Sequence, residues 1–534
     1  MKNGKTPGSD GFSVEFYKMF WTSIKELVLE SFYFAYDLGE LSIDQKRGVI
    51  KLLPKKDKIL KFLKNWRPIS LLNTDYKILA HVLASRLQMV LPDIIHPDQN
   101  GYLKGRFIGC NIRTIYDIID FSQNKEFANL ITFIDYEKAF DNIKIEYLIE
   151  TLDKFGFGEI FKNWIKIMYT NISSCVMNNG YTSIFFPLSK GVRQGCPLSA
   201  LLFILVVETL AINIRNNDKI KGVKFQENEV KISLLADDTT IFTENTTSLE
   251  IVLDTIKMFR NASGLKINQT KTKIMQVGIK KWNIKKLKID EVDKMYSLGT
   301  WFFTNTDMIN TYNFDNKFKQ FKNILNYWEL KNLNILERIK VVKTYALSKL
   351  HYTMSSLEVT EHFVQDVQSA VNMFIWGGKK PKIKQLVAYQ GIEKGGLAIP
   401  NIDFFIKANR TTWVKRLLLK NNRCTQYLCM FLPKLNFSHF IKCNYDPKDL
   451  PQEIPKFYYQ ILFAWFCLKK EPKTPLEVRR ELVILNQYIS INNEYFFDKN
   501  LVDKNTLMIN DFFCEEGRPL KHNQFTEKHG NILS

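Results

Sequence analysis

Two adjacent carboxylates, Asp237 and Asp238, lie where the sequence predicts the tip of a tight β-hairpin. Within Ile232–Phe242, two apolar β-prone runs flank Ala236 and these two residues. Neighbouring carboxylates at a strand end repel each other and lose hydration, and a hard divalent cation such as Mg²⁺ compensates this through oxygen ligands. The alternative is that both are only polar turn residues. The pair therefore indicates a metal site that needs further support from the chain.

A third carboxylate, Asp135, follows the β-like run Leu130–Ile134. A carboxylate at the carboxyl end of a buried strand is a common place for a metal site. If the two β-segments are neighbours, Asp135 joins Asp237 and Asp238, and together they can hold two divalent ions about 3.5–4 Å apart. Two Mg²⁺ ions, with Mn²⁺ as an alternative, lower the pKa of a 3′-hydroxyl nucleophile and stabilise a leaving pyrophosphate. The pattern predicts nucleotidyl transfer.

The residues directly after Asp135 have further candidate roles. Phe140 offers a flat ring that would exclude a 2′-hydroxyl, the group that separates RNA precursors from DNA precursors. In a chain with 40 phenylalanines, an ordinary core ring is the alternative. We expect Asp141 to cap the following helix or to act structurally, and we assign it no metal role.

A second unusual loop is Lys190–Ser199. Its Gly191 and Gly195 allow backbone to approach a ligand closely. Gln194 offers an amide for a base or a sugar, and Pro197 is well placed to start a helix. Glycine loops before helices are frequent, so this loop is a weak signal by itself.

Basic residues in several loops are candidates for phosphate contacts. Arg67 lies in Lys64–Asn73 and precedes a proline, which favours extended backbone and suits bidentate phosphate contact. The segment His96–Arg106 mixes turn residues, one aromatic and two cations, as a loop that follows a nucleic-acid backbone would. Lys271 and Lys273 follow in a basic turn. For each of these, a solvated surface cation is the alternative.

The composition favours a nucleic-acid partner. The 534 residues contain 75 Lys and Arg against 55 Asp and Glu, a net charge of +20, and length alone suggests about three or four domains. The eight cysteines form no Cys-x-x-Cys pair, which argues against a zinc site and favours a reducing intracellular setting. The most apolar run, Leu198–Ile214, is too short and too polar for a membrane span.

Hydrophobic periodicity predicts the main elements. Helices are expected near Phe12–Leu38, Tyr76–Leu91, Cys110–Phe121, Ile143–Lys154, from Pro197 to about Ile214, Ser248–Phe259, Phe314–Trp328 and Leu336–Tyr352, and β-runs at Val49–Pro54, Leu130–Ile134 and near Tyr296–Trp301. The basic run Lys379–Lys384 follows Phe374 and Trp376, and aromatics beside cations suit stacking on nucleic acid. A solvated charged face is an equal alternative for this run.

Taken in their order along the chain, several short motifs resemble those of the reverse transcriptase of non-LTR (LINE-type) retrotransposons. The resemblance rests on Lys5–Gly11, Trp66–Asn73, Asp98–Tyr102 with Gly105-Arg106, Ile134–Asp141, Gly191–Ser199, Leu235–Asp238, Ile375–Gly378 and Lys394–Pro400. Together these motifs span about residues 1–420. Leu235 stands where an aromatic residue is frequent in the family, which leaves the carboxylates intact.

The resemblance implies an α+β fold shaped as a right hand. Fingers with an N-terminal extension would span 1–125, and a palm with an antiparallel sheet and helices would span 126–305. A helical thumb and a linker would span 306–410, and a mainly helical region of unclear role would span 411–534.

The resemblance also implies roles for individual residues. Asp135, Asp237 and Asp238 would be the catalytic, metal-binding carboxylates, and Phe140 the ribose gate. Nucleotide contacts would fall on Tyr136, Phe140, Arg67, Arg106, Gln194 and Gly195. Template and primer contacts would fall on Lys51, Lys55, Pro197, Ser199 and Lys271.

The implied function is RNA-directed DNA synthesis during target-primed reverse transcription. The partners would be an RNA template, a DNA primer or target, dNTPs and the endonuclease part of a longer polyprotein, which is not visible in this chain, with no membrane. The protein would be intracellular, nuclear during integration and cytoplasmic as a ribonucleoprotein. The alternatives are an intron-maturase-like reverse transcriptase, an inactive nucleic-acid-binding remnant, and a carboxylate nuclease, which would not need the Gly191–Ser199 loop or Phe140.

Overall fold

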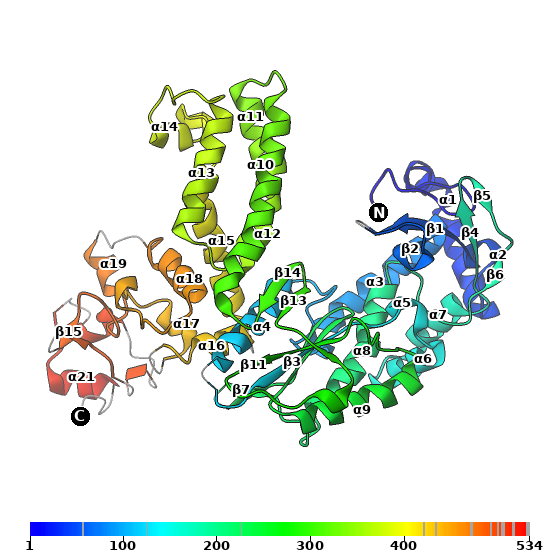
Figure 1. The fold of residues 1–534 in the computed structure, drawn as a ribbon, viewed down its shortest axis with the longest axis horizontal. Coiled ribbons are helices and arrows are strands. Elements are labelled where there is room, and N and C mark those ends of the chain that lie inside the picture. Colours follow the sequence, from blue (N-terminus) through cyan, green and yellow to red (C-terminus); the bar gives the residue numbers. More distant parts are fainter. Residues whose placement is uncertain are drawn as a thin grey trace. The chain divides into compact units, whose positions relative to one another are not determined.

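The computed structural model describes residues 1–529 except 56–57, 124, 226, 420–421, 433–434, 470–473, 492–493, 499–500, 503–507 and 515–517. The chain forms two compact units (Figure 1). The first unit comprises Met1–Asn111, Phe121–Lys224 and Glu229–Leu298, and the second comprises Ile112–Asp120, Phe225–Asn228 and Gly299–Ser534. The expected division into four parts stays a prediction.

The first unit mixes helices and strands. Its helices are α1 (Val14–Leu38), α2 (Ile43–Lys46), α3 (Thr74–Ile94), α5 (Ala139–Asn142), α6 (Ile145–Lys154), α7 (Glu159–Tyr169), α8 (Ser199–Arg215) and α9 (Thr246–Ser263). Its strands are β1 (Arg47–Pro54), β2 (Trp66–Leu72), β3 (Asn129–Ile134), β4 (Ser173–Asn178), β5 (Tyr181–Thr182), β6 (Phe186–Pro187), β9 (Ile232–Leu235), β10 (Asp238–Thr243), β11 (Lys273–Val277), β12 (Asp290–Glu291) and β13 (Lys294–Ser297). Two short strands, β7 (Val223–Phe225) and β8 (Asn228–Val230), and helix α4 (Ile108–Ser122) contribute residues to both units.

Two sheets organise this unit. The N-terminal sheet has the strand order β2-β1-β4-β5, with β6 also paired to β4. The central sheet has the order β12-β11-β3-β10-β9, and β3 runs antiparallel to both β10 and β11. All six residues of β3 are buried, which explains its mostly apolar sequence. The expected run at Leu130–Ile134 and the hairpin within Ile232–Phe242 are confirmed.

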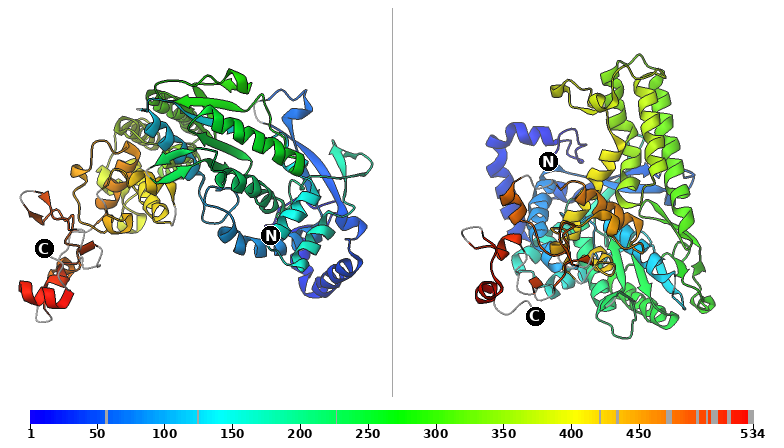
Figure 2. Two further views of the ribbon diagram at one scale, coloured as in Figure 1. Left: turned by 90° about the horizontal axis from the view of Figure 1, so that it is seen from below. Right: turned by 90° about the vertical axis from the view of Figure 1, so that its left-hand side faces the viewer.

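Helix α8 lies at the centre of the core. Its residues Leu201–Val207 are all buried, because the helix is apolar on every side and packs among other elements of the first unit. The same core cluster includes residues of α6, α9 and the central sheet. Helices α8 and α9 lie against that sheet, and α6 packs on these two helices (Figure 2). The most apolar run of the sequence is therefore a core helix, and it begins at Ser199 rather than at Pro197.

The second unit is mainly helical. Its elements are β14 (Thr300–Phe303), α10 (Asn316–Glu329), α11 (Ile335–Val341), α12 (Ser348–Ser356), α13 (Glu361–Ile375), α14 (Gln385–Tyr389), α15 (Ile402–Leu417), α16 (Arg423–Leu428), α17 (Phe437–Phe440), α18 (Lys456–Phe466), α19 (Pro475–Arg479), β15 (Ser490–Ile491), β16 (Glu494–Tyr495) and α21 (His522–His529). The single helix expected over Leu336–Tyr352 is wrong in one respect, because a π-helical segment at Val342–Ala346 separates α11 from α12. No helix among the described residues has the length and apolar character needed to cross a bilayer.

Candidate active site

The expected carboxylates come together at one end of the central sheet. Ile134, the last residue of β3, pairs with Thr239 of β10. One residue farther out, the same register brings Asp135 beside Asp238. Opposite residues of an antiparallel pair have Cα atoms roughly 4.5–5.5 Å apart. The strand register therefore brings into proximity two carboxylates that are about a hundred residues apart in the chain.

Asp237 lies in the loop of the hairpin that carries Asp238. Asp238 pairs with Leu235 of β9, which leaves Ala236 and Asp237 as a two-residue turn. Ala236 has a φ of 56°, in the left-handed region that costs a residue with a Cβ about 1–2 kcal/mol. Such a turn persists where surrounding groups hold it.

Gln99 holds this turn. Its side chain is fully buried, and its Oε1 accepts hydrogen bonds from the backbone N–H groups of Ala236 and Gly101, each at 2.8 Å. Its Nε2 donates to the carbonyl of Ala236 at 3.4 Å. A Cβ on Gly101 would lie 2.4 Å from the nitrogen of Ala236, so glycine permits this contact. The loop around Gln99 thus positions the two hairpin carboxylates.

Mutual repulsion and burial perturb these acids. Burial raises the pKa of Asp238 to about 6, with further increases from the charges of Asp237 and Asp135. Burial also raises the pKa of Asp237, and the charge of Asp135 adds to that effect. Lys271 opposes both shifts, and its Nζ lies 3.0 Å from Oδ2 of Asp135. The site therefore concentrates negative charge, which Lys271 compensates in part.

This donor set fits a hard divalent cation by its chemistry. Three carboxylates supply the oxygen ligands that Mg²⁺ prefers, and a cation would oppose the mutual repulsion that contributes to the raised pKa values of Asp237 and Asp238. Among the described residues, no group of three His, Cys, Asp or Glu side chains is already arranged to hold a metal ion. In this structure the carboxylate of Asp135 forms an ion pair with Lys271.

Cationic side chains gather near Asp135. Burial lowers the pKa of Lys55, and the positive charges of Lys271 and Arg67 lower it further, while Asp135 acts in the opposite direction. Arg67 is exposed on β2 and forms no ion pair with a described acidic residue. Lys51 is exposed on β1 of the same sheet. The arrangement supplies positive charge next to the carboxylates.

The glycine loop joins the N-terminal sheet to α5. The N–H of Ser70 on β2 donates to the carbonyl of Gln194 at 2.7 Å, and the side-chain Nε2 of Gln194 donates to Oδ1 of Asp141 at 3.0 Å. A Cβ on Gly195 would lie 2.5 Å from the carbonyl oxygen of Ser70, and one on Gly191 would lie 2.7 Å from that of Asp141. Both glycines therefore permit close packing within the protein. Asp141 receives a structural role, as expected.

The two aromatic residues after Asp135 have different surroundings. Phe140 is half-buried, and one face stacks on Phe203 with ring centroids 4.6 Å apart. Tyr136 is only 6% exposed, and burial raises its pKa to about 12. Its ring lies in the core of the first unit, so the expected contact of the Tyr136 side chain with a nucleotide is not supported by its position.

The structure corrects the expected role of Arg106. Its guanidinium donates hydrogen bonds to the backbone carbonyls of Pro92, Ile95, His96 and Gln99, at 3.3, 2.5, 2.6 and 2.6 Å. These carbonyls use the donors that a phosphate would need. Arg106 therefore stabilises the loop that carries Gln99 and is not free to bind a nucleotide.

The prediction that Ser199 contacts nucleic acid is also wrong. It is 1% exposed, and its hydroxyl lies 3.3 Å from that of Tyr169. The first turn of α8 is buried because that helix lies within the core. Pro197, two residues earlier, is half-buried and stays a candidate for template or primer contact.

Two residues gained importance only in the structure. Gln99 orients the hairpin, and Tyr102 lies close enough to Asp237 and Asp238 for their charges to raise its pKa, after the larger effect of burial. Tyr102 is exposed, with a φ of 58°. Both lie in the Asp98–Tyr102 motif, which the family resemblance had already singled out. The sequence alone did not show that this motif contacts the hairpin.

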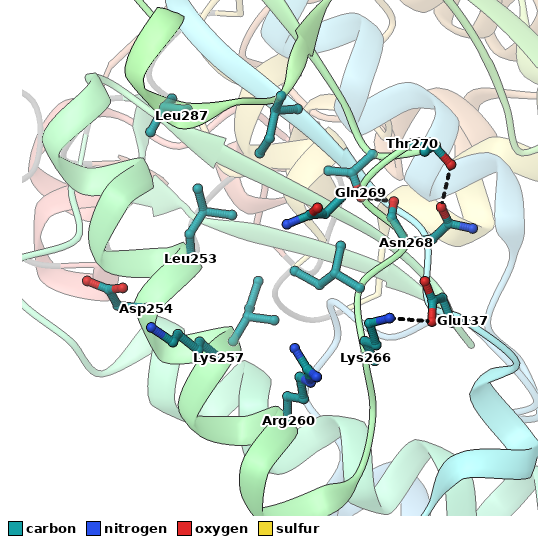
Figure 3. Close-up of a pocket in the computed structure, with 14 residues that line it drawn as sticks. Glu137, Leu253, Asp254, Lys257, Arg260, Lys266, Asn268, Gln269, Thr270 and Leu287 are labelled. Atoms are coloured by element: carbon teal, nitrogen blue, oxygen red, sulfur yellow. Dashed lines mark hydrogen bonds and ion pairs between the residues drawn. The ribbon is translucent and has the colours of Figure 1, made fainter.

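A cavity of about 660 Å³ adjoins the segment that follows Asp135 (Figure 3). One wall is α9, and another is the stretch from Lys266 to Thr272. Lys266 pairs with Glu137 at 3.0 Å, and the N–H of Asn268 donates to the carbonyl of Asp135 at 2.7 Å. The wall of this cavity therefore also supports the backbone of Asp135.

The chain matches known families over much of its length. Residues 53–302 match the family model described as reverse transcriptase (RNA-dependent DNA polymerase). A Xenopus laevis protein named "Transposon TX1 uncharacterized 149 kDa protein" is 29% identical over 432 residues, which cover 78% of this chain and 32% of that protein. The "Retrovirus-related Pol polyprotein from type-2 retrotransposable element R2DM" of Drosophila melanogaster is 30% identical over 234 residues, which cover 43% of this chain and 21% of that protein.

The chain spans less than a third of the length of either of these relatives. Among solved structures, that of telomerase from Candida tropicalis in complex with a TWJ fragment of telomeric RNA is similar, with a TM-score of 0.41 and 14% identity. The aligned region covers 78% of this chain and 68% of that one.

Proposed function

We propose that this chain copies RNA into DNA, because residues 53–302 match the reverse transcriptase family and its relatives are retrotransposon proteins. It would add deoxynucleotides to the 3′-hydroxyl of a primer with two Mg²⁺ ions, or Mn²⁺ in their place. The reaction would serve target-primed reverse transcription.

One observation supports this proposal above the others. The β3–β10 register brings Asp135 beside Asp238, and the two-residue turn adds Asp237 at the same end of the sheet. Acidic oxygens from two separate β-segments are what a pair of divalent ions requires. A turn made of polar residues alone would not explain why a third acid meets them.

Each group around the carboxylates would have a defined task. Asp135, Asp237 and Asp238 would hold the divalent ions, which when bound activate the 3′-hydroxyl and neutralise charge on the leaving pyrophosphate. Lys55 and Arg67 would attract the triphosphate, since both lie in the cationic group beside Asp135.

Two uncharged side chains would control the choice of nucleotide sugar and the backbone geometry of the hairpin. Phe140 would select the sugar with the part of its ring that Phe203 does not cover. Gln99 would keep the hairpin rigid during the reaction, because it fixes both backbone polar groups of Ala236.

The partners follow from the relatives and from charge. We propose an RNA template, a DNA primer or target and dNTPs, with an endonuclease supplied by another part of a longer polyprotein. The net charge of +20 supports a polyanionic partner. The proposed location is cytoplasmic as a ribonucleoprotein and nuclear during integration.

The test is primer extension on an RNA template with dNTPs, with and without Mg²⁺. Asp238→Asn should lower the extension rate by about 10³-fold or more, the equivalent of about 4 kcal/mol in barrier height. RNA affinity, measured by fluorescence anisotropy, should stay close to that of the wild type. Asp218→Asn is the matched control, since Asp218 is an exposed turn residue of the same unit.

Three results would separate the candidates. Full extension by the Asp238→Asn variant would remove the metal role of the hairpin. A wild type that binds RNA but extends no primer would favour the inactive remnant. Extension on RNA that disappears without Mg²⁺ and in the variant would support the proposal.

A further inference from the structure

A second pocket lies within the second unit and is separate from the carboxylate site. Its volume is about 680 Å³, within the range of roughly 300–1,000 Å³ that is usual for small-ligand sites. It is formed by α13, the turn that follows this helix, Tyr389 at the end of α14 and the start of α15. These elements include the Ile375–Gly378 motif, which the proposed polymerase chemistry does not use.

Two glycines form the turn beside this pocket. Gly377 and Gly378, directly after α13, have φ values of 58° and 74°, a backbone conformation that side chains with a Cβ rarely adopt. The N–H of Gly378 donates to the carbonyl of Met373 at 2.9 Å and ends the helix. The turn therefore brings Trp376 and Lys379 to the same pocket.

The pocket contains two aromatic rings. Trp376 and Tyr389 both line it, and both are half-buried. The hydroxyl of Tyr389 accepts a hydrogen bond from the side chain of Gln385. Phe374, the other aromatic before the basic run, is 3% exposed and belongs to the core. The pocket thus offers ring surfaces on which a planar group can stack.

An amide group adds a directional contact. The Oδ1 of Asn372 accepts a hydrogen bond from Gln368 at 3.1 Å, and its Nδ2 donates to no described residue. Gln368 itself is engaged on both sides, since its Oε1 accepts from the N–H of Ile402 at 2.8 Å. The amide nitrogen of Asn372 is therefore a donor available to a ligand with an acceptor on its edge.

The positive charge of the pocket comes from exposed lysines and not from the half-buried rings and amides. Lys379 and Lys380 line the pocket, are exposed and form no ion pair with a described acidic residue. Asp403, an acidic residue of the lining, pairs with Lys407 at 2.8 Å. A ligand would therefore place its planar, polar part among the half-buried groups and its anionic part at the rim.

We propose that this pocket binds a single unpaired nucleotide of an RNA strand. The base would stack on Trp376 and Tyr389 and accept a hydrogen bond from Asn372, and the adjacent phosphate would contact Lys379 or Lys380. A base inside a duplex is already stacked on its neighbours, so it does not stack on these rings. An acidic peptide carries its charge at the tips of its side chains. A side chain that entered the pocket would therefore place its charge among the half-buried groups and not beside the exposed lysines.

This inference rests on the proposed function only in naming RNA as the strand, and it requires no catalysis. The first measurement is therefore the affinity of the full chain for a short fluorescein-labelled single-stranded RNA without dNTPs. Trp376→Ala should lower this affinity about 5- to 100-fold, the effect of losing one stacked base, and Trp376→Phe should keep most of it. Tyr488→Ala removes an exposed ring of the same unit that does not line the pocket, and it should leave affinity unchanged.

Charge is tested separately. Replacing Lys379 and Lys380 with Gln should weaken binding and reduce the slope of log affinity against log salt by about 0.7 for each phosphate that the variant no longer neutralises. Primer extension at a saturating concentration of a short RNA template, which depends on the carboxylate site, should stay at the wild-type rate in all these variants. That result would distinguish this pocket from the polymerase site.

The decisive measurement uses the wild-type protein, so it does not depend on a variant that folds. RNA containing 4-thiouridine is photo-crosslinked, and the modified peptide is identified by mass spectrometry. Crosslinks at Trp376 or Tyr389 that a non-thiolated RNA displaces support the proposal. Crosslinks confined to other segments, displacement by AMP but not by RNA, or displacement by an acidic peptide alone would overturn it.

Discussion

Replacing Gln99 with Leu tests whether the hairpin depends on a buried clamp. Gln99→Leu keeps a side chain of similar size but replaces the amide with an apolar group, which removes the acceptor shared by the N–H groups of Ala236 and Gly101. The side chain of Gln99 is 0% exposed, so water does not replace the missing acceptor without rearrangement. Both N–H groups are then left without a partner in a buried site.

The magnitude follows from the two hydrogen bonds that the substitution removes. Each buried donor left unsatisfied costs about 1–3 kcal/mol, which gives about 2–6 kcal/mol for the pair. The unfavourable φ of Ala236 also loses its support. A loss of about 2 kcal/mol corresponds to roughly 30-fold easier local opening. The expected result is a hairpin that opens far more often while the rest of the first unit stays folded.

Hydrogen–deuterium exchange of the peptide that covers Ile232–Phe242 measures this opening directly, and primer extension measures its consequence. We expect exchange of the amide of Ala236 to rise about 30-fold or more and kcat to fall about 10- to 100-fold, because small displacements of catalytic groups are costly. Gln320→Leu, at an exposed position of α10, should change neither quantity. Unchanged exchange and unchanged kcat in the Gln99→Leu variant would refute the clamp.

The environments of other side chains lead to three more predictions. Arg106→Lys should lower the thermal midpoint without raising the KM for dNTPs, because a lysine ammonium cannot serve all four carbonyls that the guanidinium does. Arg67→Ala should instead raise that KM about 10-fold with little effect on the midpoint. The opposite assignment would restore Arg106 as a substrate contact. Phe140→Ala should raise ribonucleotide incorporation in single-nucleotide extension assays, and unchanged sugar selection would make this ring purely structural. Burial lowers the pKa of Lys469 to about 8 from its usual 10.5, so the folded chain releases this proton at lower pH than the unfolded chain. The wild type should therefore gain stability relative to Lys469→Met as pH rises from about 8 to 10.5 in urea titrations, and a constant difference would contradict the shift.

Local features of this protein were predictable from its sequence. The β-runs around Asp237 and Asp238 read as a hairpin because apolar alternation and turn residues act over a few positions. Helix α8 was predictable because every residue in Leu201–Val207 is apolar. The resemblance to non-LTR reverse transcriptases, carried by the order of short motifs, is confirmed by the reverse transcriptase match over residues 53–302 together with the similarity to retrotransposon proteins.

Only the tertiary structure decided which of the predicted residues are available to a substrate. Arg67 and Arg106 are both arginines in loop-like motifs, but the fold surrounds Arg106 with four carbonyls and leaves Arg67 exposed. Ser199 lies in a motif that suggests contact, but the packing of α8 buries it. Whether a side-chain donor is already hydrogen-bonded depends on the atoms that folding places around it. The residues next to it in the sequence do not reveal those atoms.

The meeting of the carboxylates depends on both levels. The sequence by itself determined that Asp135 follows one strand and that Asp237 and Asp238 form the turn beside another. The pairing of Ile134 with Thr239, which sets Asp135 next to Asp238, required β3 and β10 to become neighbours in one buried sheet. Strand propensity acts between nearby residues, whereas strand pairing and register depend on how the whole core packs.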